Sequence, residues 1–228
     1  MKQPGLSSTR RTFLQQSAVA GLALPVLGAA ACSSQPAAGG DKPTITGGAP
    51  AGVPIERPST WDVIKFNMER GAAGAIPAAY MAQIMAADGI PKHLGKHLPW
   101  LPTDLPADRS KEGYLAIMWG DPAKSYVEHP NAPKSEKNPE GHWYNWVKVA
   151  IAGQPASELE TTYDDWPKCS DNVKGILVGH TDGDPTEREG KNSVYLAQLP
   201  TGAKSGDTLR IWAHCLTHGE YVDFVTLA

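Results

Sequence analysis

The second half of the chain consists of short β-prone runs separated by turn-rich segments, and this pattern most limits what the chain can fold into. The runs cover residues 113–119, 142–152, 175–178, 193–199, 209–215 and 221–227. Turn-rich segments, such as 131–141, 182–190 and 202–206, lie between them. Strands of this length with frequent turns are typical of an antiparallel β-sandwich or barrel. We therefore expect an all-β domain, which we place at residues 93–228.

A short helical segment is expected before this domain, over residues 59–92. Ser59 and Thr60 offer an N-cap for a helix that begins at Trp61. Pro77 can open a second helix at its first position, and Gly89 can close it. Met81, Ile84 and Met85 lie between them at helical spacing. We interpret the segment as a helical lead-in that packs on the main domain.

The first 31 residues have the pattern of an export signal. Arg10 and Arg11 form a twin-arginine pair followed by Phe13 and Leu14, and a mildly apolar stretch covers 18–31. That stretch is too short and too weakly apolar to span a membrane permanently. The pattern resembles a twin-arginine (Tat) signal peptide, a route for proteins that have already folded. It predicts a protein of the periplasm or of the cell envelope.

The residues that follow leave the mode of attachment open. Ala29-Ala30-Ala31-Cys32 suits cleavage by an ordinary signal peptidase and also lipidation of Cys32, although a lipoprotein signal usually has Leu where Ala29 stands. Both a soluble form and a lipid-anchored form stay open. Residues 32–58 are rich in Ser, Pro, Ala and Gly, a composition that favours a flexible tether.

Charge and cysteine content exclude two broad classes of protein. Removal of residues 1–31 takes away three basic residues and no acidic one, which leaves 18 basic and 24 acidic residues. That acidic balance argues against a nucleic-acid-binding surface. Three cysteines, Cys32, Cys169 and Cys215, cannot form a disulfide scaffold. We expect Cys169 to be a structural or free thiol.

Cys215 and His218 lie in the most informative segment of the chain. If 209–215 is a strand, Cys215 shares a face with the apolar Leu209, Ile211 and Ala213, and His214 faces the other way. His218 follows in the turn, within reach of an ion bound by Cys215. A Cys-x-x-His pair alone fits a zinc site, a copper site or chance.

Three further histidines stand in short motifs upstream. His97 lies in Gly95-Lys96-His97-Leu98-Pro99, His129 in Glu128-His129-Pro130-Asn131, and His142 opens the aromatic run 142–147. Alternation along a strand puts Tyr144 and Trp146 on the same side as His142. We expect His93, His180 and His214 to be structural, with His180 alternatively a neighbour of the site.

In their order, and with the last of them near the chain end, these motifs resemble the superoxide reductase family, that is, neelaredoxin and the iron-binding domain of desulfoferrodoxin. The resemblance covers roughly residues 92–228. It implies a seven-stranded immunoglobulin-like β-sandwich with a mononuclear, non-haem iron (Fe2+/Fe3+). The implied ligands are four histidines in a plane and an axial cysteine: His97, His129, His142, His218 and Cys215.

The resemblance also implies a reaction and partners. The reaction is the one-electron reduction of superoxide to hydrogen peroxide, with Lys96 as the catalytic residue that attracts the anion and positions a water for protonation. For an exported protein, the unidentified electron donor would be periplasmic or membrane-linked. One-iron relatives tend to form homo-tetramers and others dimers, so a homo-oligomer is implied here as well.

The chain departs from the family in three places. Gly95 stands where many members have a Glu that ligates the oxidised iron. Residues 132–140 lengthen the segment between His129 and His142, and we expect a loop extension that shades the open metal position. No Cys-x-x-Cys occurs, so the four-cysteine module of two-iron members is absent.

Two other functions remain compatible with the motifs. A blue-copper electron carrier also closes a β-sandwich with Cys-x-x-His, but it usually has a Met shortly after the last histidine, and residues 219–228 contain none. The other is a non-catalytic iron-binding or sensor protein that kept the ligands and lost turnover.

Overall fold

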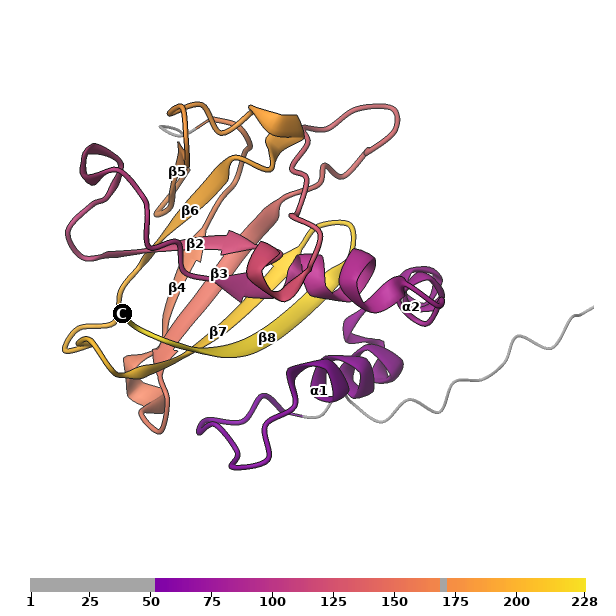
Figure 1. Cartoon of the computed structure of the whole chain (residues 1–228), viewed down its shortest axis with the longest axis horizontal. Helices are drawn as coiled ribbons and strands as arrows, with labels where there is room; N and C mark the ends of the chain where they lie inside the picture. Colours follow the sequence, from indigo (N-terminus) through magenta and orange to yellow (C-terminus); the bar gives the residue numbers. More distant parts are fainter. Residues whose placement is uncertain (1–51, 169–171) are drawn as a thin grey trace, which may run out of the picture. The chain divides into compact units, whose positions relative to one another are not determined.

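The computed structural model describes residues 52–168 and 172–228 as two four-stranded antiparallel sheets with several short helices (Figure 1). One sheet has the order β1-β2-β6-β5, and the other has the order β4-β3-β7-β8. The strands are β1 (Pro99–Trp100), β2 (Tyr114–Trp119), β3 (Tyr144–Ile151), β4 (Leu159–Thr162), β5 (Ile176–Gly179), β6 (Ser193–Gln198), β7 (Thr208–Cys215) and β8 (Gly219–Thr226).

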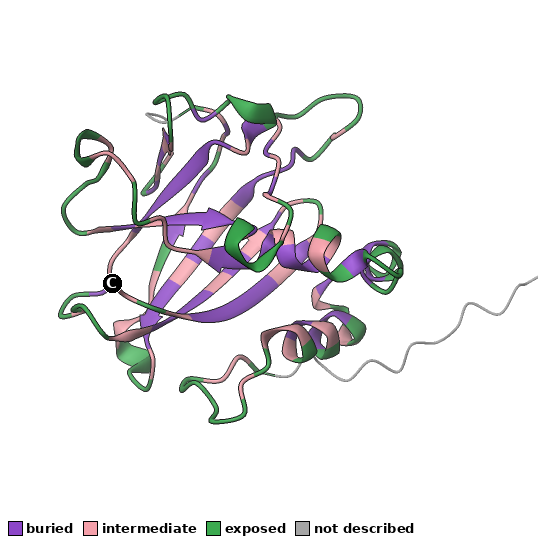
Figure 2. Ribbon diagram, viewed as in Figure 1, coloured by how far each residue is buried: buried purple, intermediate pink, exposed green. Residues whose placement is uncertain are grey.

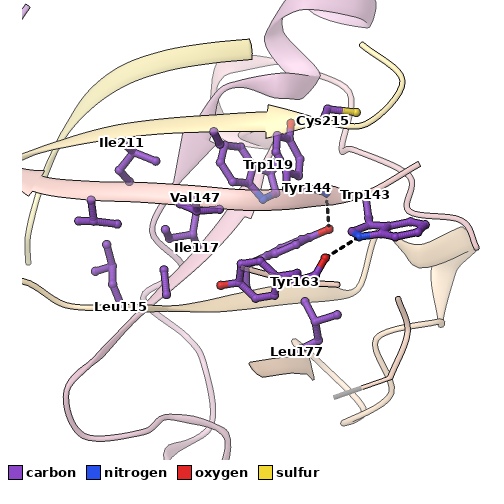
Figure 3. Close-up of a cluster of buried hydrophobic side chains, with 14 of the residues drawn as sticks. Leu115, Ile117, Trp119, Trp143, Tyr144, Val147, Tyr163, Leu177, Ile211 and Cys215 are labelled. Carbon is purple, nitrogen blue, oxygen red and sulfur yellow. Dashed lines mark hydrogen bonds between the residues drawn. The ribbon is translucent and has the colours of Figure 1, made fainter. Parts of the chain in front are cut away.

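The two sheets enclose one apolar core, and the mainly-β prediction is thereby confirmed. Figure 2 shows buried residues along the strands and exposed residues in the loops. The core takes Leu115 and Ile117 from β2, Val147 from β3 and Ile211 from β7 (Figure 3). Cys215 lies at one end of this cluster, beside Tyr144, its partner across β3 and β7. The apolar core between the sheets therefore extends as far as the thiol of Cys215.

The described residues, 52–168 and 172–228, form eight strands, not the seven that the resemblance implied. Each of the six runs expected from the residue pattern contains a strand. The two strands without such a signal are β1, which is two residues long and pairs with the end of β2, and the four-residue β4. Short strands of this kind form because a neighbouring strand offers backbone partners, so their own residues give little signal.

The helical lead-in forms two α-helices, α1 (Val63–Arg70) and α2 (Ala78–Ile84). Its caps differ from those expected. Asp62, rather than Ser59 or Thr60, caps α1 by accepting from the backbone N–H of Lys65. Pro77 is the N-cap of α2 rather than its first helical residue, and the helix stops before Met85. Met85 is consequently exposed, which corrects its expected place in the packed face.

Shorter helical turns connect the remaining elements. A π-helical turn, η1 (Gly71–Ala75), joins α1 to α2, and η2 (Ile90–Leu94) leads into the 3₁₀ turn η3 (Gly95–His97). Further 3₁₀ turns are η4 (Ala107–Arg109), η5 (Pro122–Lys124), η6 (Pro155–Ser157) and η7 (Arg188–Gly190). Within the part of the chain that the structure covers, no helix is long and apolar enough to cross a membrane.

Hydrogen bonds connect helix α1, and Trp61 just before it, to β8. The indole N–H of Trp61 donates to Asp223 Oδ1 at 2.9 Å. The amide of Asn67 bonds the backbone of Val222 in both directions, at 2.7 and 2.9 Å. These contacts bring the segment before the sandwich onto the strand that follows the Cys-x-x-His turn.

A bulge near the start of β3 changes the faces expected there. The β3–β7 register shifts between Tyr144 and Trp146. Tyr144 lies in the core, whereas Trp146 packs on the outer face against Trp212 and His214. The expectation that Tyr144 and Trp146 share a side is therefore wrong, because a bulge adds one residue to the alternation. The predicted signal peptide (1–31), Cys32 and Cys169 lie outside the described residues.

Candidate metal centre

Five of the side chains singled out in the sequence meet at one point. One potential ligand atom from each lies within 4.8 Å of all the others. They come from distant parts of the chain: η3, the segment between β2 and β3, and the turn between β7 and β8. The group consists of His97, His129, His142, Cys215 and His218.

The β7–β8 turn supplies Cys215 and His218. Cys215 is the last residue of β7 and faces the core with Leu209, Ile211 and Ala213, as strand alternation predicted. The N–H of His218 donates to the carbonyl of Cys215 at 3.2 Å, which closes the turn. This brings His218 Nδ1 to 3.7 Å from the sulfur.

The 3₁₀ turn η3 presents His97 with one ring nitrogen already bonded. Its Nδ1–H donates to the carbonyl of His93 at 2.7 Å. The tautomer is thereby set, and Nε2 is left without a hydrogen and faces the cluster. The ring stacks on Tyr221, with centroids 4.3 Å apart and planes 8° apart. His97 is therefore oriented by its backbone neighbour and by β8.

The segment between β2 and β3 supplies both His129 and His142. The N–H of His129 donates to the carbonyl of Trp119 at 3.1 Å, and Ala132 and His142 exchange two backbone hydrogen bonds. Asn131 anchors the segment: its amide donates to the Gly190 carbonyl at 2.7 Å, and its oxygen accepts from a tyrosine hydroxyl at 2.6 Å. The Asn of the His-Pro-Asn motif thus has a structural role.

Residues 132–140 form the loop that the Ala132–His142 pair closes. Together with Trp166 and Gly190, this loop lines a shallow hollow of about 550 Å³ that reaches His142. The extra length therefore shapes the surface next to one candidate ligand.

The atoms that face one another suit a metal ion. They are Nε2 of His97, His129 and His142, Nδ1 of His218 and Sγ of Cys215. His218 Nδ1 lies 3.1 Å from His97 Nε2 and 3.0 Å from His142 Nε2. His218 Nδ1 carries at most one hydrogen, and it can donate that hydrogen to only one of the two neighbouring nitrogens. Nitrogen lone pairs therefore face one another in the cluster. A cation would satisfy them, since metal–nitrogen bonds of about 2.1 Å at a right angle put two nitrogens about 3 Å apart.

No family model, curated protein or solved structure matches this chain. The observation that stands is a buried cluster of four histidines and one cysteine, able to hold a metal ion, in a β-sandwich.

Burial sets the protonation of the cluster. It lowers the pKa of all four imidazoles, to about 4 for His142 and about 2 for His218, with repulsion from neighbouring cations as the smaller cause. It raises the pKa of the Cys215 thiol to about 12. At neutral pH the imidazoles are therefore neutral, the form that ligates a metal, and the thiol keeps its proton.

Lys96 places a positive charge beside the cluster. Its Nζ lies 5.4 Å from the centroid of the Tyr80 ring. Burial lowers the pKa of Lys96, and attraction to Cys215, when that residue is ionised, opposes the shift. In turn, the ammonium depresses the pKa of His142 and of His218. Lys96 is therefore within electrostatic reach of the centre.

The surroundings of Gly95 leave no space for the glutamate that many superoxide reductases, the family that the motifs resemble, have at this position. A Cβ built at Gly95 would lie 2.4 Å from the ring of Tyr126. The aromatic ring therefore occupies the space that a glutamate side chain would need at this position.

The remaining histidines contact other parts of the fold. His180 Nε2 bonds Asp104 at 2.8 Å, and His214 Nδ1 bonds the side chain of Asn145 at 2.6 Å. His93 contributes its carbonyl to His97, a role that no side-chain motif could reveal. Tyr80, on α2, was also missed in the sequence. Its ring packs on His218, and nothing in the local pattern of α2 distinguishes it from an ordinary core residue.

Proposed function

We propose that this protein is an immunoglobulin-like superoxide reductase that holds a mononuclear iron with His97, His129, His142, His218 and Cys215. In this reaction superoxide takes up one electron and two protons and leaves as hydrogen peroxide. The observation that carries the proposal is the convergence of four imidazoles and one thiol on one buried point. The same donor set is implied by the family resemblance of the motifs.

The number and type of donors favour iron over the common alternatives. Structural zinc sites use four ligands, and blue-copper sites use two histidines and a cysteine with a weak axial ligand. Five donors exceed both sets and leave one position of an octahedral metal free. When bound here, iron would supply a one-electron Fe2+/Fe3+ couple, tuned by the thiolate.

Lys96 is the residue proposed to meet the substrate. Superoxide is an anion, and an ammonium beside the neutral imidazoles would attract it into the site. Partial burial favours the neutral amine and so lowers the pKa of Lys96, which eases transfer of a proton toward a reduced oxygen species. Gly95, packed against Tyr126, brings no carboxylate into competition for the open position.

The cellular setting is part of the same proposal. We propose export by the Tat pathway, with the protein either soluble in the periplasm or anchored by lipid at Cys32. Folding before export would allow iron to be loaded away from copper and zinc, which bind such ligands more tightly. A periplasmic or membrane-linked donor would return the electron, and the protein would act as a homo-oligomer without binding nucleic acid.

Anaerobic loading with Fe2+ followed by pulses of superoxide tests the reaction. We expect a thiolate-to-Fe3+ absorption band to appear as one peroxide forms per iron oxidised. Cys215→Ser should lose this band, and Lys96→Ala should keep the band but capture superoxide more slowly at low salt. Lys124→Ala, which changes an exposed lysine on η5, is the matched control.

The same experiment separates the alternatives. Iron that binds tightly but does not react with superoxide would replace the proposal with an iron-binding or sensor function. A strong preference for copper with an intense blue colour would replace it with an electron carrier. An unchanged rate in Lys96→Ala would remove Lys96 from substrate capture.

A further inference from the structure

The helical lead-in also contributes to the metal centre through Tyr80 on α2. Tyr80 is 4% exposed and belongs to a second apolar cluster with Ile76, Ile84 and Tyr221. This segment lies outside the part of the chain that carries the motifs. We propose that Tyr80 is a positioning residue, which fixes the ring of His218 and the carbonyl that orients His97.

The first contact is between rings. The Tyr80 ring stacks on the imidazole of His218, with centroids 3.7 Å apart and planes 24° apart. His218 lies in a turn, where a side chain would otherwise choose among rotamers. Stacking on one face restricts rotation of the imidazole and keeps Nδ1 directed at the cluster, where it lies 3.1 Å from His97 Nε2.

The second contact is a shared carbonyl. The Tyr80 hydroxyl donates to the carbonyl of His93 at 3.1 Å, and His97 Nδ1–H donates to the same oxygen at 2.7 Å. The Tyr80 ring also meets the rings of His93 and His97 edge-on, at 5.6 and 5.5 Å. One tyrosine therefore supports two of the four candidate histidine ligands, one through its face and one through its hydroxyl.

The backbone beside His218 docks against the same lead-in. Gly219 has φ of +85°, and a Cβ built there would lie 2.2 Å from the carbonyl of Ala75. Ala75 ends η1, and α2 begins three residues later at Ala78. The turn that carries His218 is therefore in close backbone contact with the segment that delivers Tyr80.

Tyr80→Leu, Tyr80→Phe and Met81→Ala separate positioning from helix stability. Leucine keeps an apolar side chain but removes the stacking, and phenylalanine removes only the hydroxyl. Met81 is a buried neighbour on α2 in the same apolar cluster, and the ring contacts to the histidines come from Tyr80. Met81→Ala therefore loosens the packing of α2 without changing the stacked ring. Circular dichroism checks that each variant remains folded.

The first readout uses metal-free protein, so it does not depend on the reaction. Histidine ring resonances are recorded by NMR in the presence of a chelator. We expect one narrow set for His218 in the natural protein and in Met81→Ala, and broadened or doubled signals in Tyr80→Leu. Narrow His218 signals in Tyr80→Leu, or equal broadening in Met81→Ala, would overturn the proposal.

The second readout is the affinity for Co²⁺, used as a spectroscopic probe. Loss of a residue that orients ligands typically weakens metal binding by about 10- to 100-fold. We expect Tyr80→Leu to fall in this range, Tyr80→Phe to lose less, and Met81→Ala to stay near the natural value. Unchanged affinity in Tyr80→Leu would contradict the inference. This readout rests on the proposed function: if the natural chain bound no Co²⁺, the proposed function would fail, and the NMR result would still decide the role of Tyr80.

Discussion

The protonation of single residues is the property of the centre that burial controls most directly. An imidazolium or a thiolate loses its hydration when it enters the sandwich, so the neutral form of each is favoured. This lowers the pKa of His142 and His218 and raises that of Cys215. The centre therefore has four neutral imidazoles ready to bind and one proton that a metal must displace.

Metal binding should release one proton near neutral pH. Because the thiol is the only candidate ligand protonated there, the affinity for Co²⁺ should rise about tenfold per pH unit between about pH 6 and about pH 8. The change in Co²⁺ affinity per pH unit should become larger only as the pH falls toward about 4, the pKa of His142. Co²⁺ titrations across this range measure the slope, and Cys215→Ser should flatten it. A twofold steeper slope near neutrality would show that a histidine is also protonated.

Gly95 offers a second prediction for a single residue. A methyl group added there would press on the Tyr126 ring, and overpacking of this kind costs about 1–3 kcal/mol. Gly95→Ala should therefore lower the free energy of unfolding in urea. Gly52→Ala is the control, since its added Cβ would meet nothing within 4 Å. Gly95→Ala should cost less in a Tyr126→Ala background than in the natural chain, and an equal cost in both backgrounds would exclude the steric cause.

The attachment of α1 to β8 depends on a buried carboxyl at Asp223. The side chain is 5% exposed and accepts from Trp61 Nε1 and from the N–H of Phe224. Burial raises its pKa, and the hydrogen bonds from Trp61 and Phe224 partly oppose the shift, with smaller contributions from Lys124 and Arg57. The protonated carboxyl is therefore favoured in the folded state. Its contribution to stability is present at low pH and is lost as the pH rises through the raised pKa.

Asp223→Asn tests this account of the α1–β8 contact. The amide oxygen can still accept from Trp61 and Phe224, and the side chain carries no charge at any pH. The free energy of unfolding of the variant should therefore rise relative to that of the natural chain as the pH increases from about 4 to about 8. Urea unfolding of both proteins at the two pH values measures the difference. A difference that shrinks as the pH rises would contradict the raised pKa.

For the whole molecule, the centre joins segments that are far apart in sequence. Along the chain, His97 follows the helical lead-in. The segment that connects β2 to β3 carries His129 and His142, and the turn of the β7–β8 hairpin carries Cys215 and His218. A metal ion bound by all five would join the turn η3, the connection between the two sheets and the β7–β8 hairpin. Metal occupancy should therefore be linked to the stability of the fold.

Bound metal should raise the melting temperature, and a chelator should lower it again. At free metal 100 times the dissociation constant, the linkage amounts to about 2.7 kcal/mol. His129→Ala should lose most of this gain. His180→Ala is the matched control because His180 bonds Asp104 instead of facing the cluster. Thermal unfolding with Co²⁺ and with chelator checks both variants, and an equal gain in the two would exclude His129 from the site.

The sequence by itself determined the features that follow from local periodicity and short motifs. Alternation along residues 209–215 predicted which side of β7 Cys215 faces, and the family resemblance of the histidine motifs implied the set that the structure brings together. Where a bulge broke the alternation, as at Trp146, the same reasoning failed.

Only the tertiary structure decided which ring nitrogens face one another, which groups are protonated, and what surrounds the site. Tyr80 reaches His218 across 138 positions of the chain, and Tyr126 fills the space beside Gly95. The physical reason is that strand alternation is encoded in backbone geometry, whereas desolvation and ring contacts depend on residues that only folding brings together.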